Sequence, residues 1–310
     1  MPASRFEVRA PTREEAGAIA GLLNDRARVL RGRSDASVDE IRSWFDAPDL
    51  DPDQDFRIAV LADARLAGYV DVGDPAGDGR TLWIDLRVHP DSGGRPVAEA
   101  LLDAAEARAR QRAAPGAKVR GFASDDDALA AACFEARGYR VIRSSFRMAI
   151  ELDGELPSPV PPEGISIRPF RPGEERLVYD ASHDAFADTW DFTPTPYEEW
   201  LYWSTSGDHD PSLWFLAEDG EEVAGVSLCR PTAHGDPDCG WVSTLGVRPP
   251  WRRRGLGRAL LLHSFAEFRR RGLEAAALGV DAESPTGAVR LYERAGMHVE
   301  RRNDVYERPV

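Results

Sequence analysis

A basic, glycine-containing loop between residues 247 and 258 has the residue types that most directly suggest chemistry. An apolar strand ends at Val247, and an amphipathic helix follows the loop. Gly255 and Gly257 leave backbone amides unshielded, and the start of the helix presents free N–H groups and the positive end of its dipole. The loop therefore predicts an anion site suited to a pyrophosphate. The arginines that add positive charge are Arg252, Arg253, Arg254 and Arg258.

Two other phosphate-binding loops do not match this segment. A Walker loop requires Gly-Lys-Ser/Thr, and that tripeptide is absent. A dinucleotide fingerprint requires a third glycine where Leu260 stands, together with a parallel strand–helix–strand context. The predicted hairpin formed by residues 213–218 and 223–229 contradicts that context.

The pattern Arg252-x-x-Gly255-x-Gly257 resembles the acetyl-CoA signature of the GCN5-related N-acetyltransferase (GNAT) family. The preceding Val247-x-Pro249 and the downstream segment 279–296, which ends in Leu-Tyr-Glu-Arg-Ala-Gly, agree with it. The resemblance implies acetyl-CoA or another acyl-CoA as co-substrate, and no metal. The cofactor-binding residues that it implies are Leu245, Val247, Arg252, Arg253, Arg254, Gly255, Leu256, Gly257 and Arg258.

Tyr292 is the catalytic residue that the resemblance implies. In the family, the matching tyrosine lies near the thioester sulfur and acts as general acid toward the departing thiolate. A phenol with a pKa of about 10 can donate a proton to that sulfur. The alternative is that Tyr292 is a core aromatic on an amphipathic helix. Ser284 is interpreted as a helix N-cap rather than a site residue.

The acceptor site is predicted in the segment 183–192, because the first two helices and their loop wall the acceptor cleft in similar proteins. Carboxylates among aromatic residues suit an amine through charge and cation–π contact. The alternative is a solvated helix end. The candidate substrate-binding residues are His183, Asp184, Asp188 and Asp191.

The sequence repeats itself at a nearly constant spacing. Phe6–Arg9 and Ile165–Arg168 lie 159 residues apart, as do Val88-His-Pro90 and Val247-Arg-Pro249. Capping boxes are predicted at Ser37–Glu40 and Thr195–Glu198. This repeat predicts a domain at 1–152, a proline-rich linker at 153–163 and a second domain at 164–310. The alternative is one large domain with incidental similarities.

The second copy reads as a mixed sheet with helices on its faces, so an α+β fold of two tandem GNAT-like domains is expected. Strands are predicted at 165–168, 213–218, 223–229, 240–247, 275–280 and 305–308. Helices are predicted at 174–186, 196–203, 258–271 and 285–295, the last with Pro285 in its first turn.

The first copy is predicted to be degenerate. Pro96 and Ala98 replace Gly255 and Gly257, Glu99 places negative charge at the anion site, and Phe134 replaces the catalytic tyrosine. We expect this copy to be structural, with a regulatory pocket as the alternative.

Composition narrows the class of protein. The chain has 310 residues and a net charge of -14, which disfavours nucleic acid as a partner. No apolar run is long enough for a membrane helix, and the N-terminus has no apolar signal core, so a cytoplasmic protein is expected. We expect a monomer or a homodimer. Cys133, Cys229 and Cys239 lack metal-ligand spacing and are interpreted as buried thiols.

The tandem arrangement at this length is similar to that of the actinobacterial mycothiol synthases. That family is expected to carry an acidic base on the strand before the loop, where this sequence has Trp241. We therefore expect a related N-acyltransferase that acts on a different small amine, which the charge suggests is cationic. The alternatives are a peptide or protein N-terminal acetyltransferase, which needs an open groove, and a CoA-binding sensor without turnover.

Overall fold

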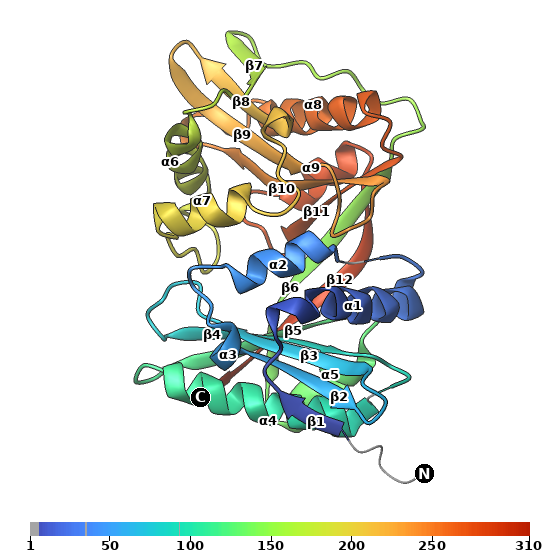
Figure 1. The fold of residues 1–310 in the computed structure, drawn as a ribbon. Helices are drawn as coiled ribbons and strands as arrows, with labels where there is room; N and C mark the ends of the chain where they lie inside the picture. The colour runs from blue at the N-terminus through green and yellow to red at the C-terminus, as the bar shows by residue number, and fades with distance from the viewer. Residues whose placement is uncertain (1–5, 35, 93) are drawn as a thin grey trace. The chain divides into compact units, whose positions relative to one another are not determined.

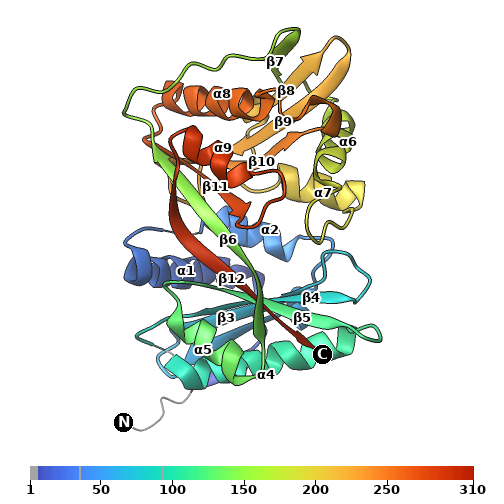
Figure 2. The ribbon, with the colours of Figure 1, turned by 180° about the vertical axis from the view of Figure 1, so that it is seen from behind.

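The computed structural model describes residues 6–34, 36–92 and 94–310 and divides the chain into two compact units (Figures 1 and 2). The N-terminal unit comprises Met1–Ser144 and Arg301–Val310, and the C-terminal unit comprises Ser145–Glu300. Each unit is an α+β domain in which a mixed sheet carries helices on both faces, as predicted.

The sheet of the N-terminal unit is antiparallel from β1 to β4, parallel between β4 and β5, and closed by an antiparallel strand beside β5. Helices α4 and α5 bury their apolar side chains with one face, and α1 and α2 with the other. The elements are β1 (Phe6–Arg9), the 3-10 helix η1 (Arg13–Glu15), α1 (Ala16–Arg31), α2 (Val38–Phe45), α3 (Pro52–Asp55), β2 (Phe56–Leu61), β3 (Leu66–Gly73), β4 (Thr81–Val88), α4 (Gly94–Arg112), β5 (Lys118–Ser124) and α5 (Ala128–Ala136).

The sheet of the C-terminal unit has the same plan. β7 to β10 are antiparallel neighbours, β10 and β11 are parallel, and β6 lies antiparallel to β11. The elements are β7 (Ile165–Pro169), α6 (Glu175–Phe186), α7 (Tyr197–Thr205), η2 (Pro211–Leu213), β8 (Trp214–Asp219), β9 (Glu222–Arg230), β10 (Cys239–Val247), η3 (Pro249–Trp251), α8 (Leu256–Arg270), β11 (Ala275–Asp281) and α9 (Ala288–Arg294). Two strands belong to both units: β6 (Arg140–Glu151) enters the C-terminal unit at Ser145, and β12 (His298–Pro309) enters the N-terminal unit at Arg301.

Each unit takes its last strand from the other half of the sequence. Residues 303–309 of β12 pair with β5, and residues 145–151 of β6 pair with β11. This exchange differs from the predicted division into 1–152 and 164–310. Apolar alternation identifies a strand but does not identify the strand that it pairs with. The open edges of β5 and β11 each need one antiparallel strand, and the sequence does not show which of the two available strands pairs with which edge. The predicted proline-rich linker follows β6 and has no regular structure over residues 155–162.

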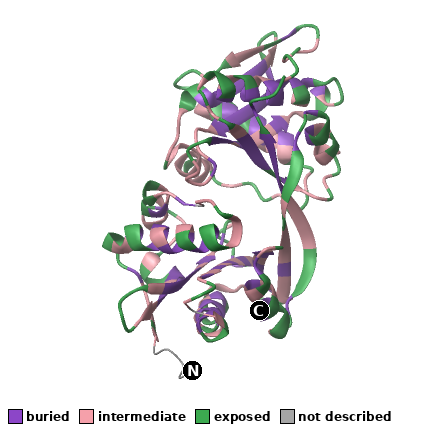
Figure 3. Ribbon diagram, turned by 90° about the vertical axis from the view of Figure 1, so that its right-hand side faces the viewer, coloured by how far each residue is buried: buried purple, intermediate pink, exposed green. Residues whose placement is uncertain are grey.

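The core of the C-terminal unit follows the predicted pattern on α8. Leu261, Ser264, Phe265 and Phe268 are all buried, and they face a sheet whose strand β9 is buried along nearly its whole length (Figure 3). Helices α8 and α9 pack on this face, and α6 and α7 pack on the other. Two layers of helices therefore hold the central strands β10 and β11 in place.

Two predicted helix starts differ from the structure. Helix α9 begins at Ala288 with Gly287 as its N-cap, instead of at Pro285 behind Ser284. The Ser284 hydroxyl bonds that of Thr286 at 2.9 Å, so it is not available as a cap, and Gly287 takes a φ of 72° that glycine tolerates. The capping box predicted at Thr195 does not form, whereas that of Ser37 and Glu40 does.

The remaining structural predictions concern thiols, metals and membranes. The three cysteines are free and buried, as predicted. Within the described residues there is no cluster of histidine, cysteine and acidic side chains that could hold a metal. None of the helices in this part of the chain is long and apolar enough to cross a bilayer.

Candidate functional site

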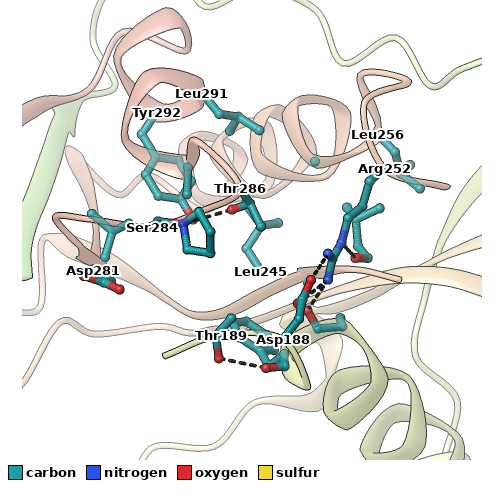
Figure 4. A pocket seen from close by; sticks show the side chains of 18 of the residues that line it. Asp188, Thr189, Leu245, Arg252, Leu256, Asp281, Ser284, Thr286, Leu291 and Tyr292 are labelled. Atoms are coloured by element: carbon teal, nitrogen blue, oxygen red, sulfur yellow. Dashed lines mark hydrogen bonds and ion pairs between the residues drawn. The ribbon is translucent and has the colours of Figure 1, made fainter. Parts of the chain in front are cut away.

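A cavity opens in the C-terminal unit where two parallel strands separate. β10 and β11 are paired only from Cys239–Val242 to Ala275–Leu278. The register of β10 against β9 then shifts between Val242 and Thr244, and such a bulge bends the strand that carries it. A cavity of 930 Å³ lies at this opening, lined by β10, the loop after it, α8, β11, α9 and the end of α6 (Figure 4).

The loop after β10 forms one end of the cavity and has an unusual backbone. Arg253 has a φ of 59° and Gly255, the N-cap of α8, has a φ of 87°. The amides of the first turn of α8 have no carbonyl partner within the helix, so they can donate to an anion. This geometry agrees with the anion site that the sequence predicts.

The two glycines of the loop are required for different reasons. A side chain at position 255 would have open space, but its left-handed backbone would be strained. A Cβ at position 257 would lie 3.1 Å from Leu291 Cδ1, because α9 approaches α8 closely there. Gly257 therefore allows the two helices to pack beside the cavity.

The four arginines of the loop divide into two pairs. Arg252 donates two hydrogen bonds to Asp188, at 2.5 and 2.9 Å, and one to the Ala185 carbonyl at 3.0 Å. Arg254 lies 3.8 Å from Asp219. Arg253 and Arg258 are exposed and have no partner among the described residues. The predicted free positive charge therefore belongs to Arg253 and Arg258.

Most of the predicted cofactor residues line this one cavity. The lining includes Leu245, Val247, Arg252, Arg253, Gly255, Leu256 and Gly257, but not Arg254 or Arg258.

Tyr292 lies in the same cavity, on α9. Its side chain is 7 % exposed and contributes to the core, yet it also lines the cavity. Its hydroxyl makes no hydrogen bond to any of the described residues. Burial raises the pKa of Tyr292 to about 12, so the phenol keeps its proton at neutral pH. The group can therefore act as a proton donor inside the cavity.

The acidic residues predicted to hold the acceptor are engaged elsewhere. Asp184 accepts a hydrogen bond from Arg248 at 2.6 Å, and Asp188 holds Arg252. Both charges are already compensated, so neither is a free carboxylate for an ammonium ion. The loop is instead tied to the end of α6 by these pairs.

The other two predicted acceptor residues do not join the cavity lining. The imidazole Nδ1 of His183 lies 3.0 Å from the Tyr179 carbonyl, and its ring packs on that tyrosine. Asp191 follows α6 with a φ of 57°.

Asp281 is a cavity residue that sequence reasoning missed. It ends β11 and lines the cavity together with Gly279. Leu278 and Val280, which alternate with Gly279 and Asp281, contribute to the core under α8 and α9, so Asp281 projects from the opposite face of the strand. The signal was available, because an acid at the end of an apolar strand and out of phase with its core residues is predicted to face solvent or a site.

Trp241 occupies the position where an acidic base was expected. Its ring packs against Arg147, whose guanidinium lies 5.1 Å from the ring centroid, and against His234 at 4.8 Å. The Arg147 side chain also donates to Glu300 at 2.6 Å. The β10 strand therefore brings an aromatic surface, and no carboxylate, to this face.

The N-terminal unit has a different backbone at the matching loop. Helix α8 begins at Leu256, and the residue that matches Leu256 at the 159-residue spacing is Val97. Helix α4 begins at Gly94, so it starts three residues earlier than α8 does in its copy. Pro96 lies in its first turn, where it is tolerated but supplies no amide. Phe134 is fully buried, and a Cβ at Gly121 would lie 2.3 Å from its ring. The position that matches Tyr292 is thus filled by a packed aromatic without a hydroxyl.

Sequence comparison agrees with this geometry. The sequence model of the Acetyltransferase (GNAT) family matches residues 19–139 and 176–297, once in each half of the chain. The chain belongs to the GNAT family. It is a tandem N-acetyltransferase, and both matched regions fall on the two copies that the repeat predicts.

Individual relatives extend the match. A mycothiol acetyltransferase from Thermomonospora curvata is 36% identical over 246 residues, 76% of this chain and 76% of that protein. One from Streptomyces coelicolor is 28% identical over 92% of this chain and 89% of that protein.

Solved structures show the same tandem fold. A GCN5-related N-acetyltransferase from Sphaerobacter thermophilus has a TM-score of 0.79 and 35% identity, covering 98% of this chain and 95% of that one. A tandem GNAT protein from the clavulanic acid biosynthesis pathway shares the fold at a TM-score of 0.73, with 16% identity and 98% of each chain covered.

Proposed function

We propose that the C-terminal unit transfers an acetyl group from acetyl-CoA directly to the nitrogen of a small-molecule amine. The observation that carries this proposal is a single cavity with an anion-binding loop at one end and the hydroxyl of Tyr292 inside it. An acyl-CoA has a pyrophosphate and a thioester, and the cavity offers a matching group for each.

Different residues around the cavity suit different parts of acetyl-CoA. The amides of the loop and the charges of Arg253 and Arg258 suit the pyrophosphate. Beyond Val242, β10 no longer pairs with β11, so its edge can hydrogen-bond the amides of the pantetheine arm beside Leu245 and Val247. These contacts position the thioester, and binding at such fixed groups lowers the entropic cost of reaction.

Tyr292 supplies the proton that the leaving group requires. When the amine attacks the thioester and the C–S bond breaks, the electron pair stays on sulfur. The buried phenol is neutral and can protonate that thiolate. The N-terminal unit has neither the loop nor the tyrosine, and we propose that it does not bind the cofactor.

A mass-spectrometric screen tests the function. The purified chain and acetyl-CoA are incubated with a panel of amines, amines that also bear a thiol, aminoglycosides and peptides with free N-termini. A small-molecule product heavier by one acetyl group supports the proposal. Acetylation confined to the peptides would favour an N-terminal acetyltransferase, and binding of acetyl-CoA without any product would favour a sensor.

A second candidate acceptor comes from the mycothiol acetyltransferases among the relatives. The 36% identity to one of them favours an acceptor of that type. Trp241 argues against it, because the expected acid on β10 is absent. The deacetylated form of mycothiol therefore belongs in the panel, and its rate relative to the other amines decides between the two.

A further inference from the structure

Gly279 is a glycine in the interior of a strand, and the backbone there does not require glycine. Glycine weakens a strand because it loses more conformational freedom on folding than other residues do. In strands it marks a bulge, a tight bend or the close approach of another group. β11 pairs with β6 in unbroken register from Ala275 to Asp281, so there is no bulge at Gly279. Its φ also lies outside the left-handed region.

The neighbours of Gly279 do not require glycine either. A Cβ at this position would meet only the edge of the Trp241 indole, 3.8 Å from Cη2 and 3.9 Å from Cζ2, which is ordinary van der Waals contact. The other glycines that line the cavity are Gly246, Gly255 and Gly257. A Cβ at 246 or 257 would have a neighbour at 2.9 or 3.1 Å, and a side chain at 255 would strain the backbone. Gly279 differs from all three, because neither packing nor backbone explains it.

Gly279 lies where the cavity passes between two strands. The pairing of β10 with β11 ends at Val242 and Leu278, so Gly279 is the first residue of β11 beyond it. The residue is exposed, and it lines the cavity. A ligand in the cavity can therefore come against the backbone of β11 at this point, and such an approach accounts for the glycine.

The face of the strand indicates which ligand comes close to Gly279. Leu278 and Val280 contribute to the same core as Tyr292, under α8 and α9. Position 279 alternates with them, so it faces the other side of the sheet, toward Trp241. The loop after β10 and Tyr292, which suit acetyl-CoA, belong to the first face. This leaves the part of the cavity beside Gly279 to the acceptor.

The ring of Trp241 is held from two sides. The Arg147 guanidinium lies 5.1 Å from the ring centroid and donates to Glu300 at 2.6 Å. The ring of His234 packs edge-on against the indole at 4.8 Å. A group beside Gly279 therefore meets an aromatic edge that is fixed in place. The width available at this point depends on residue 279, which has a hydrogen where alanine would have a methyl group.

We propose that Gly279 determines acceptor specificity, a role that rests on the proposed acetyl transfer. Because it has no side chain, it admits an amine whose nitrogen-bearing carbon is branched or part of a ring. An unbranched amine has only a CH₂ group next to its nitrogen and needs less width beside the strand. A ring or a branch places a second carbon there, and that carbon occupies the space in which a Cβ of residue 279 would lie.

The decisive variant is Gly279→Ala. The probes are cyclohexylamine, whose nitrogen is on a ring carbon, and hexylamine, which has the same number of carbons in an unbranched chain. Each is measured as a substrate and as a competitive inhibitor against the best amine of the screen. We expect the parent to favour cyclohexylamine. In Gly279→Ala the kcat/KM for cyclohexylamine, or its affinity as an inhibitor, should fall by roughly 10–200-fold, the range for one methylene in a pocket, while hexylamine stays near the parent value.

Two further measurements distinguish this role from a structural one. Gly279→Ala should melt at the same temperature as the parent or higher, because the methyl group fits and alanine reduces the conformational freedom of the unfolded chain. Acetyl-CoA binding by calorimetry should be unchanged, since residue 279 faces away from Tyr292. Gly73→Ala is the matched control: Gly73 is a strand glycine of the N-terminal unit with open space for a methyl group, and this variant should match the parent with both amines.

The outcomes separate the two proposals. If the parent acetylates amines of the screen but does not favour cyclohexylamine over hexylamine, or if Gly279→Ala changes both by the same factor or neither, this inference is overturned while the function stands. A melting temperature well below that of the parent would give Gly279 a structural role and overturn it equally. If the parent binds acetyl-CoA and acetylates none of the amines, the proposed function fails and this inference fails with it.

Discussion

Tyr292 and Asp188 of the cavity have pKa values shifted in opposite directions. Tyr292 is already a neutral phenol at neutral pH, and burial raises its pKa further, to about 12. The guanidinium of Arg252 has the opposite kind of effect and lowers the pKa of Asp188. Tyr292 is thus held as an acid and Asp188 as an anion.

Replacement of Tyr292 by Phe tests the acid directly. Tyr292→Phe should leave acetyl-CoA affinity unchanged, because the ring stays packed, and should lower kcat by roughly 10²–10⁴-fold. Stopped-flow or single-turnover measurements would establish that chemistry limits the rate. Tyr306→Phe, a buried tyrosine of the N-terminal unit, is the matched control and should match the parent. An unchanged single-turnover rate in Tyr292→Phe would rule out the role.

The left-handed residue of the loop gives a second prediction. Gly255→Ala has open space for its methyl group, so its cost is backbone strain, about 1–2 kcal/mol of unfolding free energy. Gly255→Asn should cost less, because asparagine tolerates this conformation better. Urea denaturation of both variants measures the difference. Equal stability of the alanine variant and the parent would contradict the strained backbone.

At the level of elements, the loop is fixed by its contacts with α6 as well as by its own backbone. Arg248 binds Asp184, and Arg252 binds Asp188 and the Ala185 carbonyl. Asp184 and Asp188, which the sequence analysis proposes as substrate-binding residues, thus hold α6 against the loop after β10. Side-chain pairing across elements does not follow from residue spacing, so the sequence could not show that Asp184 and Asp188 pair with arginines of the loop.

A double-mutant cycle measures this contact. Asp188 is 56 % exposed, so water screens its pair with Arg252, and we expect a coupling energy below about 1 kcal/mol in Asp188→Asn with Arg252→Gln. Each single variant should nevertheless raise the KM for acetyl-CoA, because the loop loses its support. The pKa of Asp188 is depressed in the folded state, so the pair contributes above the ordinary pKa of Asp and is lost as pH falls through the lowered value. KM values equal to that of the parent would contradict a supporting role.

Elements whose bounds depend on nearby residues could be predicted from the sequence, and those that depend on tertiary pairing could not. The bounds of α6 and β9 to β11 and the position of the glycine loop follow from periodicity and turn residues, whereas Tyr292 was singled out by the family resemblance. The start of α9 was misplaced because Ser284 and Pro285 are good helix-start residues, while Gly287 actually takes the cap. Asp281 was passed over because its place in the cavity depends on where β10 and β11 separate, and that point is set by tertiary pairing.

At the level of the whole chain, the two copies should differ in ligand binding. Titration calorimetry should give one acetyl-CoA per chain, and Gly257→Pro should abolish it, since proline removes an amide and would press on Leu291. The matched variant Ala98→Pro in the N-terminal unit should leave the stoichiometry at one in any folded sample. Two equal sites in the parent would refute the predicted difference.

The exchanged strands predict which fragments fold. The C-terminal unit is a continuous segment, residues 145–300, that carries the strand beside β11. Residues 164–310 lack that strand and leave the edge of β11 open. We expect the first fragment to be monomeric with a cooperative melting transition, and the second to aggregate. Light scattering and circular dichroism check both, and equal behaviour would contradict the exchange. The repeat predicted two copies, but identical strand patterns in both copies could not reveal which strand completes which sheet.

The same exchange bears on why a copy without the cofactor loop persists in the gene. In a simple tandem duplication, a deletion can remove an idle domain and leave the working one whole. Here the sheet of the C-terminal unit includes residues 145–151, which belong to the first copy in the sequence, and the sheet of the N-terminal unit in turn uses residues 303–309 of the second copy. A deletion at the repeat boundary therefore damages both sheets. Loss of either copy would leave the sheet of the other with an open edge, so the exchange itself favours keeping both copies.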